Sequence, residues 1–157
     1  MTGSTSGIGR ATELALARAG AFAVVTGRDE MRGKEICEET RAAGGRAALV
    51  PADLTDPDAV SDLARRAPAK AGGQIDILVN NAGDGFYAPT EGISLETFEA
   101  LFAVNTRAPF HLTAALAPAM AQRGHGVVVN VTGTAADLGV AALSVFGGAK
   151  AALASMR

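Results

Sequence analysis

The sequence has few residues that would support a disulfide-linked, metal-binding or nucleic-acid-binding protein. Its single cysteine, Cys37, excludes an internal disulfide, and with two isolated histidines it makes no metal-ligand cluster. The net charge is -2, and the lysines and arginines are scattered along the chain. A nucleic-acid-binding surface needs a clustered basic face, so we expect no nucleic-acid partner.

Long apolar runs, tryptophan and a leader sequence are also missing. No run reaches the roughly 18 apolar residues of a membrane span, and no signal peptide precedes the first glycines. We therefore expect a cytoplasmic protein with no membrane partner. Aromatic residues are only 4% of the chain, so the core must be aliphatic and alanine-rich. With 48% apolar and 19% charged residues, the 157 residues are typical of a single globular domain over 1–157.

Short apolar runs alternate with helical patterns along the whole chain. Strands are expected at 21–26, 46–50, 75–79 and 127–131, and helices at 10–19, 29–43, 56–69, 94–104, 106–122 and 143–157. Asn105 is expected to interrupt the helical pattern between 94 and 122. This alternation predicts an α/β fold with a parallel sheet that helices cover on both faces.

The first nine residues contain a glycine-rich turn, Thr2-Gly3-Ser4-Thr5-Ser6-Gly7-Ile8-Gly9, that leads into a helix. Gly3 permits a tight turn, Gly7 lets the backbone approach a phosphate, and Gly9 lets the helix pack closely. The free N–H groups and the helix dipole then favour a pyrophosphate. Such spacing alone is a weak signal, but further polar residues follow the later strands: Arg28, Asp53, Asn80 and Thr132 to Thr134. Ligands bind at this edge of parallel sheets.

The chain resembles the short-chain dehydrogenase/reductase family over essentially its whole length. The resemblance rests on the glycine turn, Asp53-Leu54, Asn80-Asn81-Ala82-Gly83, Asn105 and Lys150, taken together. The resemblance implies a Rossmann-type, doubly wound parallel sheet that binds NAD(H) or NADP(H). It also implies hydride transfer to or from a small carbonyl or alcohol. The implied cofactor-binding residues are Gly3, Ser4, Thr5, Ser6, Gly7, Ile8, Gly9, Arg28, Asp53, Leu54, Asn80, Ala82, Gly83 and Lys150.

Arg28 favours NADP over NAD. NAD-preferring folds place a carboxylate after the second strand, whereas an arginine there can pair with a 2′-phosphate. The alternative is an exposed arginine paired with Asp29 or Glu30. Asp53 resembles the residue that contacts the adenine, although it could instead be a helix cap. Asn80 to Gly83 resembles the motif that walls the adenosine site.

The catalytic half departs from the family pattern. Lys150 and Asn105 match the family lysine and asparagine, but Phe146 stands at the tyrosine position and Gly133 at the serine position. Phenylalanine has no proton to give and glycine has no hydroxyl, so we expect impaired turnover. Thr132 or Thr134 could replace only the polarising serine. Tyr87 is expected to be a partly buried aromatic at the pocket rim.

The resemblance also implies that the chain is truncated at both ends, without the first strand and the C-terminal strands. Because that first strand is central in this fold, its absence would leave a gap in the sheet. Three hypotheses follow: an NADP-preferring oxidoreductase, a non-catalytic dinucleotide-binding or subunit-interaction module, and a fragment without function. Family dimers imply homo-oligomers through helices 106–122 and 143–157.

Overall fold

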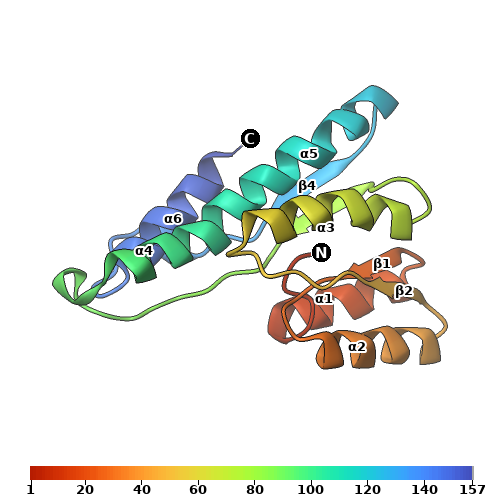
Figure 1. The fold of residues 1–157 in the computed structure, drawn as a ribbon, viewed down its shortest axis with the longest axis horizontal. Helices are drawn as coiled ribbons and strands as arrows, with labels where there is room; N and C mark the ends of the chain where they lie inside the picture. The colour runs from red at the N-terminus through yellow and green to blue at the C-terminus, as the bar shows by residue number, and fades with distance from the viewer. Residues whose placement is uncertain (157) are drawn as a thin grey trace.

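The computed structural model describes residues 1–156 and contains two parallel, two-stranded sheets with helices on both sides (Figure 1). The first half of the chain contains α1 (Gly7–Arg18), β1 (Phe22–Val25), α2 (Glu30–Ala42), β2 (Arg46–Leu49), α3 (Pro57–Lys70) and β3 (Ile77–Asn80). The second half contains η1 (Thr90–Gly92), α4 (Leu95–Phe102), η2 (Ala103–Arg107), α5 (Ala108–Arg123), β4 (Val127–Asn130), η3 (Thr134–Ala136) and α6 (Ser144–Ser155). Arg157, at the end of the last predicted helix, lies outside the described residues.

Local sequence signals explain where several helices begin and end. Asp56 caps α3 by accepting the Asp58 N–H at 2.9 Å, and Pro57 occupies the first helical position, where no N–H is needed. Ser94 caps α4 by accepting the Thr97 N–H at 3.1 Å. Gly124 ends α5 with a left-handed φ of 72°.

Alternate residues of β1 face two different helical layers. Ala23 and Val25 pack with α1 and α2, whereas Val24 packs with α3 and α5. A strand that is apolar on both faces is typical of a parallel sheet between two helical layers. The predicted α/β Rossmann-type architecture is therefore confirmed.

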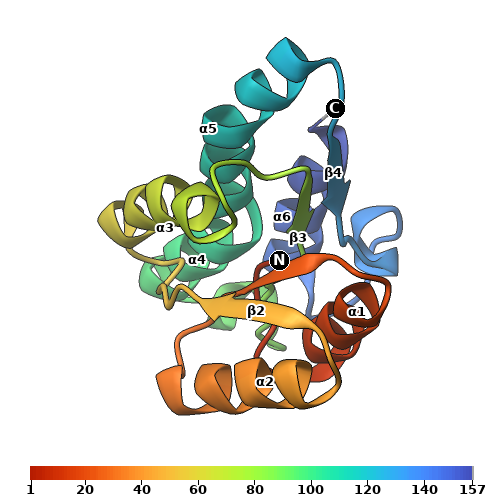
Figure 2. The same ribbon diagram turned by 90° about the vertical axis from the view of Figure 1, so that its right-hand side faces the viewer.

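The two sheets do not continue into one another within residues 1–156. β1 pairs with β2 and β3 pairs with β4, all in parallel, and no ladder joins β1 to β3. Three backbone bonds from the N-terminal residues bridge the carboxyl ends of these strands: Met1 N to Val24 O at 3.1 Å, Thr2 N to Val79 O at 2.9 Å and Ser4 N to Thr26 O at 3.0 Å. Figure 2 shows the N-terminus between the two sheets. The expected gap in an incomplete Rossmann sheet is confirmed.

The predicted interruption at Asn105 takes another form. The backbone stays helical from α4 through η2 into α5, and η2 is a π-helical turn with Asn105 at its centre. A π turn inserts an extra residue without ending the helix, which hydropathy patterns do not reveal. None of the helices among residues 1–156 is both long enough and apolar enough to cross a membrane.

Candidate functional site

A cleft of about 320 Å³ lies at the carboxyl ends of β1, β2 and β3. It brings together most of the residues that the sequence predicted to bind a cofactor. The predicted residues lining it are Gly3, Thr5, Ser6, Gly7, Ile8, Gly9, Arg28, Asp53, Leu54, Ala82 and Gly83. These residues come from four separate loops, so the fold itself assembles the cleft.

Two glycines of the turn are required by close backbone contacts. Gly3 has a left-handed φ of 63°, and a Cβ on it would lie 2.9 Å from the Cα of Ala82. A Cβ on Gly9 would lie 2.1 Å from the Gly3 carbonyl oxygen. Gly9 therefore lets α1 pack against the turn itself, whereas Gly7 has a φ of 52° with open space around it.

Helix α1 begins earlier than the sequence pattern predicted. Its first residue is Gly7, and the Arg10 N–H donates to the Ser6 carbonyl. The N–H groups of Gly7, Ile8 and Gly9 precede that bond, so they have no i−4 partner within the helix. These amides lie at the positive end of the helix dipole and line the cleft, which makes the cleft suitable for an anion.

Thr2 and Asn81 fasten the glycine turn to the loop after β3. The Thr2 hydroxyl accepts the backbone N–H groups of Asn81 and Ala82, both at 3.0 Å. The Asn81 amide donates to the carbonyls of Thr2 at 3.0 Å and Gly3 at 3.3 Å. Sequence reasoning missed Thr2 as a support for the site, because no local pattern shows which loop its hydroxyl meets.

Arg28 and Asp53 lie on the same side of the cleft. Asp29 and Glu30, the two expected partners of Arg28, pair instead with Arg32 and Lys34. Within residues 1–156, Arg28 forms no ion pair, so its guanidinium is free to meet an anion.

Asp53 holds its loop through Thr55. Its carboxylate accepts the backbone N–H of Thr55 at 2.9 Å and the Thr55 hydroxyl at 2.8 Å. These two bonds, with a smaller contribution from nearby Arg28, hold the pKa of Asp53 below its ordinary value. The carboxyl is therefore ionised at neutral pH, where it acts only as an acceptor.

Ser4 and Asn80 point into the interior rather than along the cleft. The Ser4 hydroxyl accepts the Thr26 N–H at 2.8 Å, and Ser4 is fully buried. The Asn80 amide donates to the Asn130 side chain at 2.9 Å, which ties β3 to β4. Both residues therefore support the site from beneath, because their backbone positions direct the side chains away from the predicted ligand.

Asn105 and Lys150 converge on Gly83. A Cβ on Gly83 would lie 3.1 Å from Oδ1 of Asn105 and 3.2 Å from Nζ of Lys150. Asn105 donates to the carbonyls of Asp84 at 2.8 Å and Leu101 at 2.9 Å, while its buried Oδ1 has no hydrogen-bond partner. Lys150 donates to the Val131 carbonyl at 2.8 Å, and burial lowers its pKa. The predicted pair therefore does come together, through η2 and α6.

Of the two departures from the family pattern, Phe146 lies beside Lys150, and Gly133 follows Val131, whose carbonyl Lys150 bonds, by two residues. The Phe146 ring centroid is 5.9 Å from the Lys150 ammonium. Gly133 has an extended φ of -172°, and a Cβ on it would meet nothing within 4 Å. Tyr87 is 73% exposed, so the prediction that it is partly buried is wrong. The loop after β3 turns its side chain outward.

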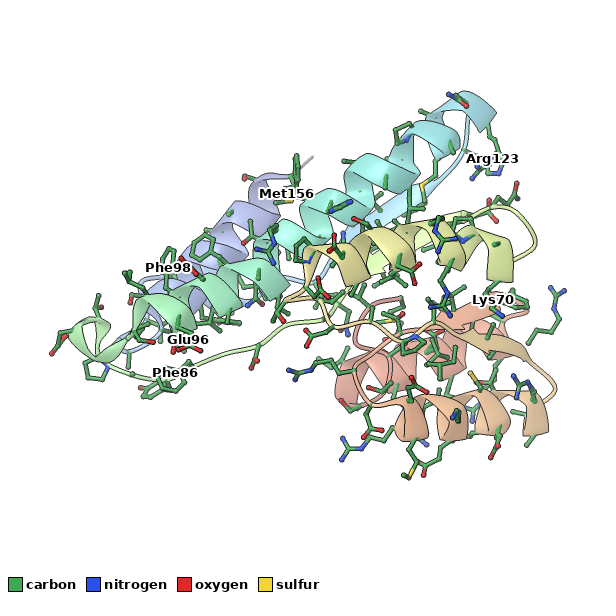
Figure 3. All side chains as sticks on the ribbon, in the orientation of Figure 1. Lys70, Phe86, Glu96, Phe98, Arg123 and Met156 are labelled. Atoms are coloured by element: carbon green, nitrogen blue, oxygen red, sulfur yellow. The ribbon has the colours of Figure 1, made fainter. Side chains whose placement is uncertain are left out.

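A second hollow of about 370 Å³ adjoins the cleft at Asp84, which lines both. Its other lining residues come from the loop after β3 and from α4: Gly85, Phe86, Glu96, Thr97, Ala100 and Leu101. Figure 3 shows Phe86 and Glu96 together at this end of the molecule. The lining is mixed, with an aromatic ring and two carboxylates.

Comparison with known proteins places the chain in a large family. The sequence pattern of the short chain dehydrogenases matches residues 1–157. A ketoacyl reductase of Nostoc sp. is 35% identical over 98% of this chain and 53% of its own length. A D-beta-hydroxybutyrate dehydrogenase of Rhizobium meliloti is 37% identical over 83% of this chain and 51% of its own length. The chain thus spans about half the length of these curated relatives.

Solved structures agree with the sequence relatives. A metagenomic short-chain oxidoreductase in complex with NADP superposes with a TM-score of 0.93. It is 35% identical over 99% of this chain and 70% of its own length. A short-chain dehydrogenase from Sphingobium yanoikuyae in complex with NADPH has a TM-score of 0.91, with 32% identity over 98% of this chain and 59% of its own. The glycine turn, the cleft and the match along all 157 residues lead to one conclusion: this chain belongs to the short-chain dehydrogenase family.

Proposed function

We propose that the cleft binds NADP(H) and that the chain is an oxidoreductase by descent whose turnover is impaired. The observation that supports binding most strongly is the convergence of four loops on one cleft beneath the start of α1. The amides of Gly7, Ile8 and Gly9 would hold the pyrophosphate. Any side chain at Gly3 or Gly9 would collide with the backbone, so the turn keeps the shape that lets a phosphate approach.

Arg28 supports NADP as the preferred form. Its guanidinium lines the cleft without an acidic partner among residues 1–156, so a 2′-phosphate would be its ion pair. Asp53 and Leu54, on the next loop, also line the cleft and would contact the adenine. Related proteins have been solved with NADP and with NADPH, which agrees with this assignment.

Lys150 and Asn105 would act at the nicotinamide end of the cleft. The bound cofactor supplies the hydride, and the ammonium of Lys150 would orient the adjoining ribose. The free Oδ1 of Asn105 can hold a water beside that ammonium. No phenol or hydroxyl stands at Phe146 or Gly133 to exchange a proton with a carbonyl or alcohol. Loss of one such group costs about 10²–10⁴ in rate.

Calorimetric titration with NADPH and NADH tests the binding proposal. We expect Arg28→Ala to weaken NADPH binding by about tenfold or more and to leave NADH binding unchanged, because only NADPH has the 2′-phosphate. Arg18→Ala is the matched control, since Arg18 is exposed at the far end of α1. Equal loss for both cofactors, or no binding to the unaltered protein, would contradict the proposal.

A role as a subunit of a homo-oligomer is the second candidate, and exposed apolar side chains support it. Phe110 on α5 is 62% exposed, and Leu95 on α4 is 81% exposed. α5 lies within the first of the two predicted interface helices, 106–122, except for its last residue. Light scattering after gel filtration would test it: Phe110→Glu should convert oligomers to monomers, whereas Tyr87→Glu, on another exposed aromatic, should not.

A further inference from the structure

The π turn η2 bonds to three separate parts of the site through consecutive residues. Asn105 donates to the loop after β3 at 2.8 Å. The hydroxyl of the next residue, Thr106, donates to the Ala149 carbonyl of α6 at 3.0 Å. Nη2 of Arg107 donates to the Thr55 carbonyl, in the loop after β2, at 2.6 Å. Because a helical turn directs consecutive side chains around its axis, this one turn can hold all three parts in place.

Arg107 and Asp53 hold the same residue, Thr55, through different groups. Asp53 accepts the N–H and the hydroxyl of Thr55, and both bonds reach the same carboxylate oxygen, Oδ1. Arg107 holds the Thr55 carbonyl. Within residues 1–156, the other carboxylate oxygen of Asp53, Oδ2, has no hydrogen-bond partner. This oxygen is therefore free to accept a bond from a ligand in the cleft that Asp53 lines.

Arg107 lies outside the lining of the cleft. Among residues 1–156, that lining includes Asp53, Leu54 and Val104 but neither Thr55 nor Arg107. Arg107 is exposed, and its bond joins a cation to a carbonyl, which makes the bond stronger than one between two neutral groups. Arg107 would therefore influence a bound cofactor through the position of the loop that carries Asp53.

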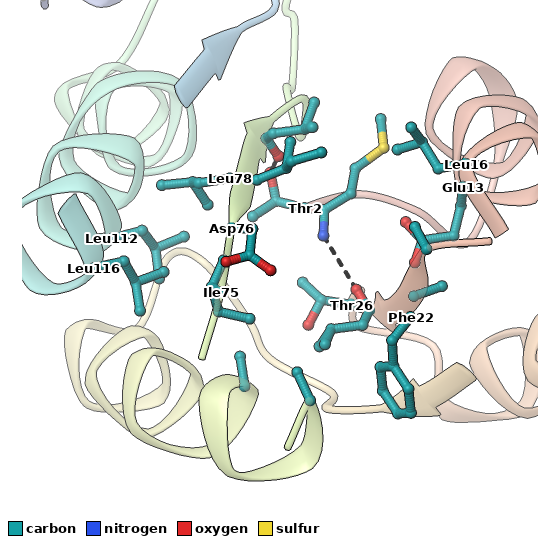
Figure 4. Close-up of a pocket in the computed structure, with 18 of the residues that line it drawn as sticks. Thr2, Glu13, Leu16, Phe22, Thr26, Ile75, Asp76, Leu78, Leu112 and Leu116 are labelled. Atoms are coloured by element: carbon teal, nitrogen blue, oxygen red, sulfur yellow. Dashed lines mark hydrogen bonds between the residues drawn. The ribbon is translucent and has the colours of Figure 1, made fainter. Parts of the chain in front are cut away.

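Helix packing brings Arg107 and Thr55 near each other. α3 begins two residues after Thr55, and α5 begins directly after Arg107. Leu63 of α3 belongs to the same apolar cluster as Leu112 and Leu116 of α5. Figure 4 shows these two leucines of α5 beside the pocket between β1 and β3 that Leu63 also lines. Because this packing holds the two helices together, loss of the Arg107 bond should leave them in place and free only the loop.

We propose that Arg107 is a positioning residue for adenine recognition, a role that rests on the proposed binding of NADP(H). Its bond to Thr55 keeps Oδ2 of Asp53 directed into the cleft, where it accepts a bond from the amino group of the adenine. That amino group distinguishes adenine from hypoxanthine, which has a carbonyl oxygen at the same position. An ionised carboxylate is only an acceptor, so it would repel that oxygen. Arg107 therefore sets the preference for an adenine dinucleotide.

Calorimetric titration with NADPH and with reduced nicotinamide hypoxanthine dinucleotide phosphate tests this role. We expect the unaltered protein to bind NADPH at least about tenfold more tightly than the hypoxanthine analogue. Arg107→Met keeps the apolar stem of the side chain and should reduce this ratio to about threefold or less, by weakening NADPH binding alone. Arg107→Lys keeps a cationic donor and should retain most of the ratio. Arg65→Met, at an exposed arginine that pairs with Asp62 on α3, is the matched control and should leave the ratio unchanged.

A double-variant cycle separates positioning from a general loss of stability. Asp53→Asn should by itself remove the preference for NADPH, because its amide also presents a donor. Adding Arg107→Met to Asp53→Asn should then change the ratio no further, since Arg107 acts through Asp53. A merely structural role of Arg107 would weaken both ligands equally in either background.

The outcomes distinguish this role from the binding proposal on which it rests. An unchanged ratio in Arg107→Met, whether both ligands bind less tightly or neither does, would overturn the role of Arg107 while the cleft still binds NADPH. Equal affinity of the unaltered protein for the two ligands would do the same. Binding of neither ligand by the unaltered protein would overturn the proposed function, and the role of Arg107 with it.

Discussion

Gly9 and Gly133 are both glycines near the proposed site, yet their surroundings differ completely. A Cβ on Gly9 would lie 2.1 Å from a backbone oxygen and 2.7 Å from the Asn81 amide nitrogen, while one on Gly133 would meet nothing. The Gly3 oxygen belongs to the backbone and cannot swing aside as the end of a side chain could, so the turn itself would have to move. The fold therefore requires glycine at position 9, whereas position 133 has room for a side chain.

This contrast predicts the effect of adding a methyl group. Gly9→Ala should lower the free energy of unfolding by at least about 2 kcal/mol, and Gly133→Ala should change it by less than about 0.5 kcal/mol. Chemical denaturation of the two variants beside the unaltered protein measures both values. Equal stability of the two variants would show that α1 can shift away from the turn.

Glu13 gives the stability of the molecule a pH dependence. Burial raises its pKa from 4.5 to about 7, although the neighbouring Met1 ammonium opposes part of that rise. The folded protein keeps a proton that the unfolded chain loses between these pH values. The contribution of Glu13 is therefore fully present below pH 4.5 and is lost as the pH rises through 7.

Glu13→Gln removes this titration. We expect the variant to match the unaltered protein near pH 4.5 and to be more stable by about 3 kcal/mol above pH 7.5, because 1 pKa unit corresponds to about 1.4 kcal/mol. Urea denaturation at both pH values gives the difference. If Glu13→Gln and the unaltered protein differ in stability by the same amount at both pH values, the titration of Glu13 is not the cause of the pH dependence.

At the level of elements, the Thr2 hydroxyl is one of two side-chain groups, with the Asn81 amide, that fasten the glycine turn to the loop after β3. Thr2 accepts two backbone N–H groups from the loop after β3, and both would lose their acceptor if the hydroxyl were removed. Thr2→Val keeps the shape of the side chain and should destabilise the protein by about 2–4 kcal/mol. Thr132→Val, at an exposed threonine, is the control and should have little effect. Thermal unfolding distinguishes the two, and a neutral Thr2→Val would contradict this role.

The elements themselves were largely predictable from the sequence, and the side-chain directions were not. Apolar runs with β-branched residues placed all four strands within two residues at each end, since buried parallel strands have a plain pattern. The directions of Ser4 and Asn80 depend on neighbours distant in sequence, Thr26 and Asn130. The π turn at Asn105 likewise leaves no periodic signal.

The candidate site was predictable only in part, for the same reason. Glycine spacing and residues after strands identified most of the cleft lining, because the carboxyl ends of parallel strands meet at one edge. The outward turn of Tyr87 and the role of Thr2 depend on how two loops pack. Neither has a local sequence signal.

At the scale of the whole molecule, the two halves of the site differ in what they retain. The glycine turn, Arg28 and Asp53 line one cleft, and this is the half that we propose to bind the dinucleotide. The half formed by η2 and α6 brings Asn105 and Lys150 to Gly83, but the residue beside Lys150 is Phe146, which has no proton to exchange. We infer that this chain can bind the dinucleotide without turning over a carbonyl or alcohol substrate at an ordinary rate.

The central claim is tested most directly by the rate of NADPH oxidation with a panel of carbonyl compounds. The comparison is between the unaltered protein and the double variant Phe146→Tyr with Gly133→Ser, whose serine enters open space. With equal NADPH affinity for both proteins, we predict a rate at least about 100-fold higher for the double variant. Equal rates for the two proteins would contradict the account.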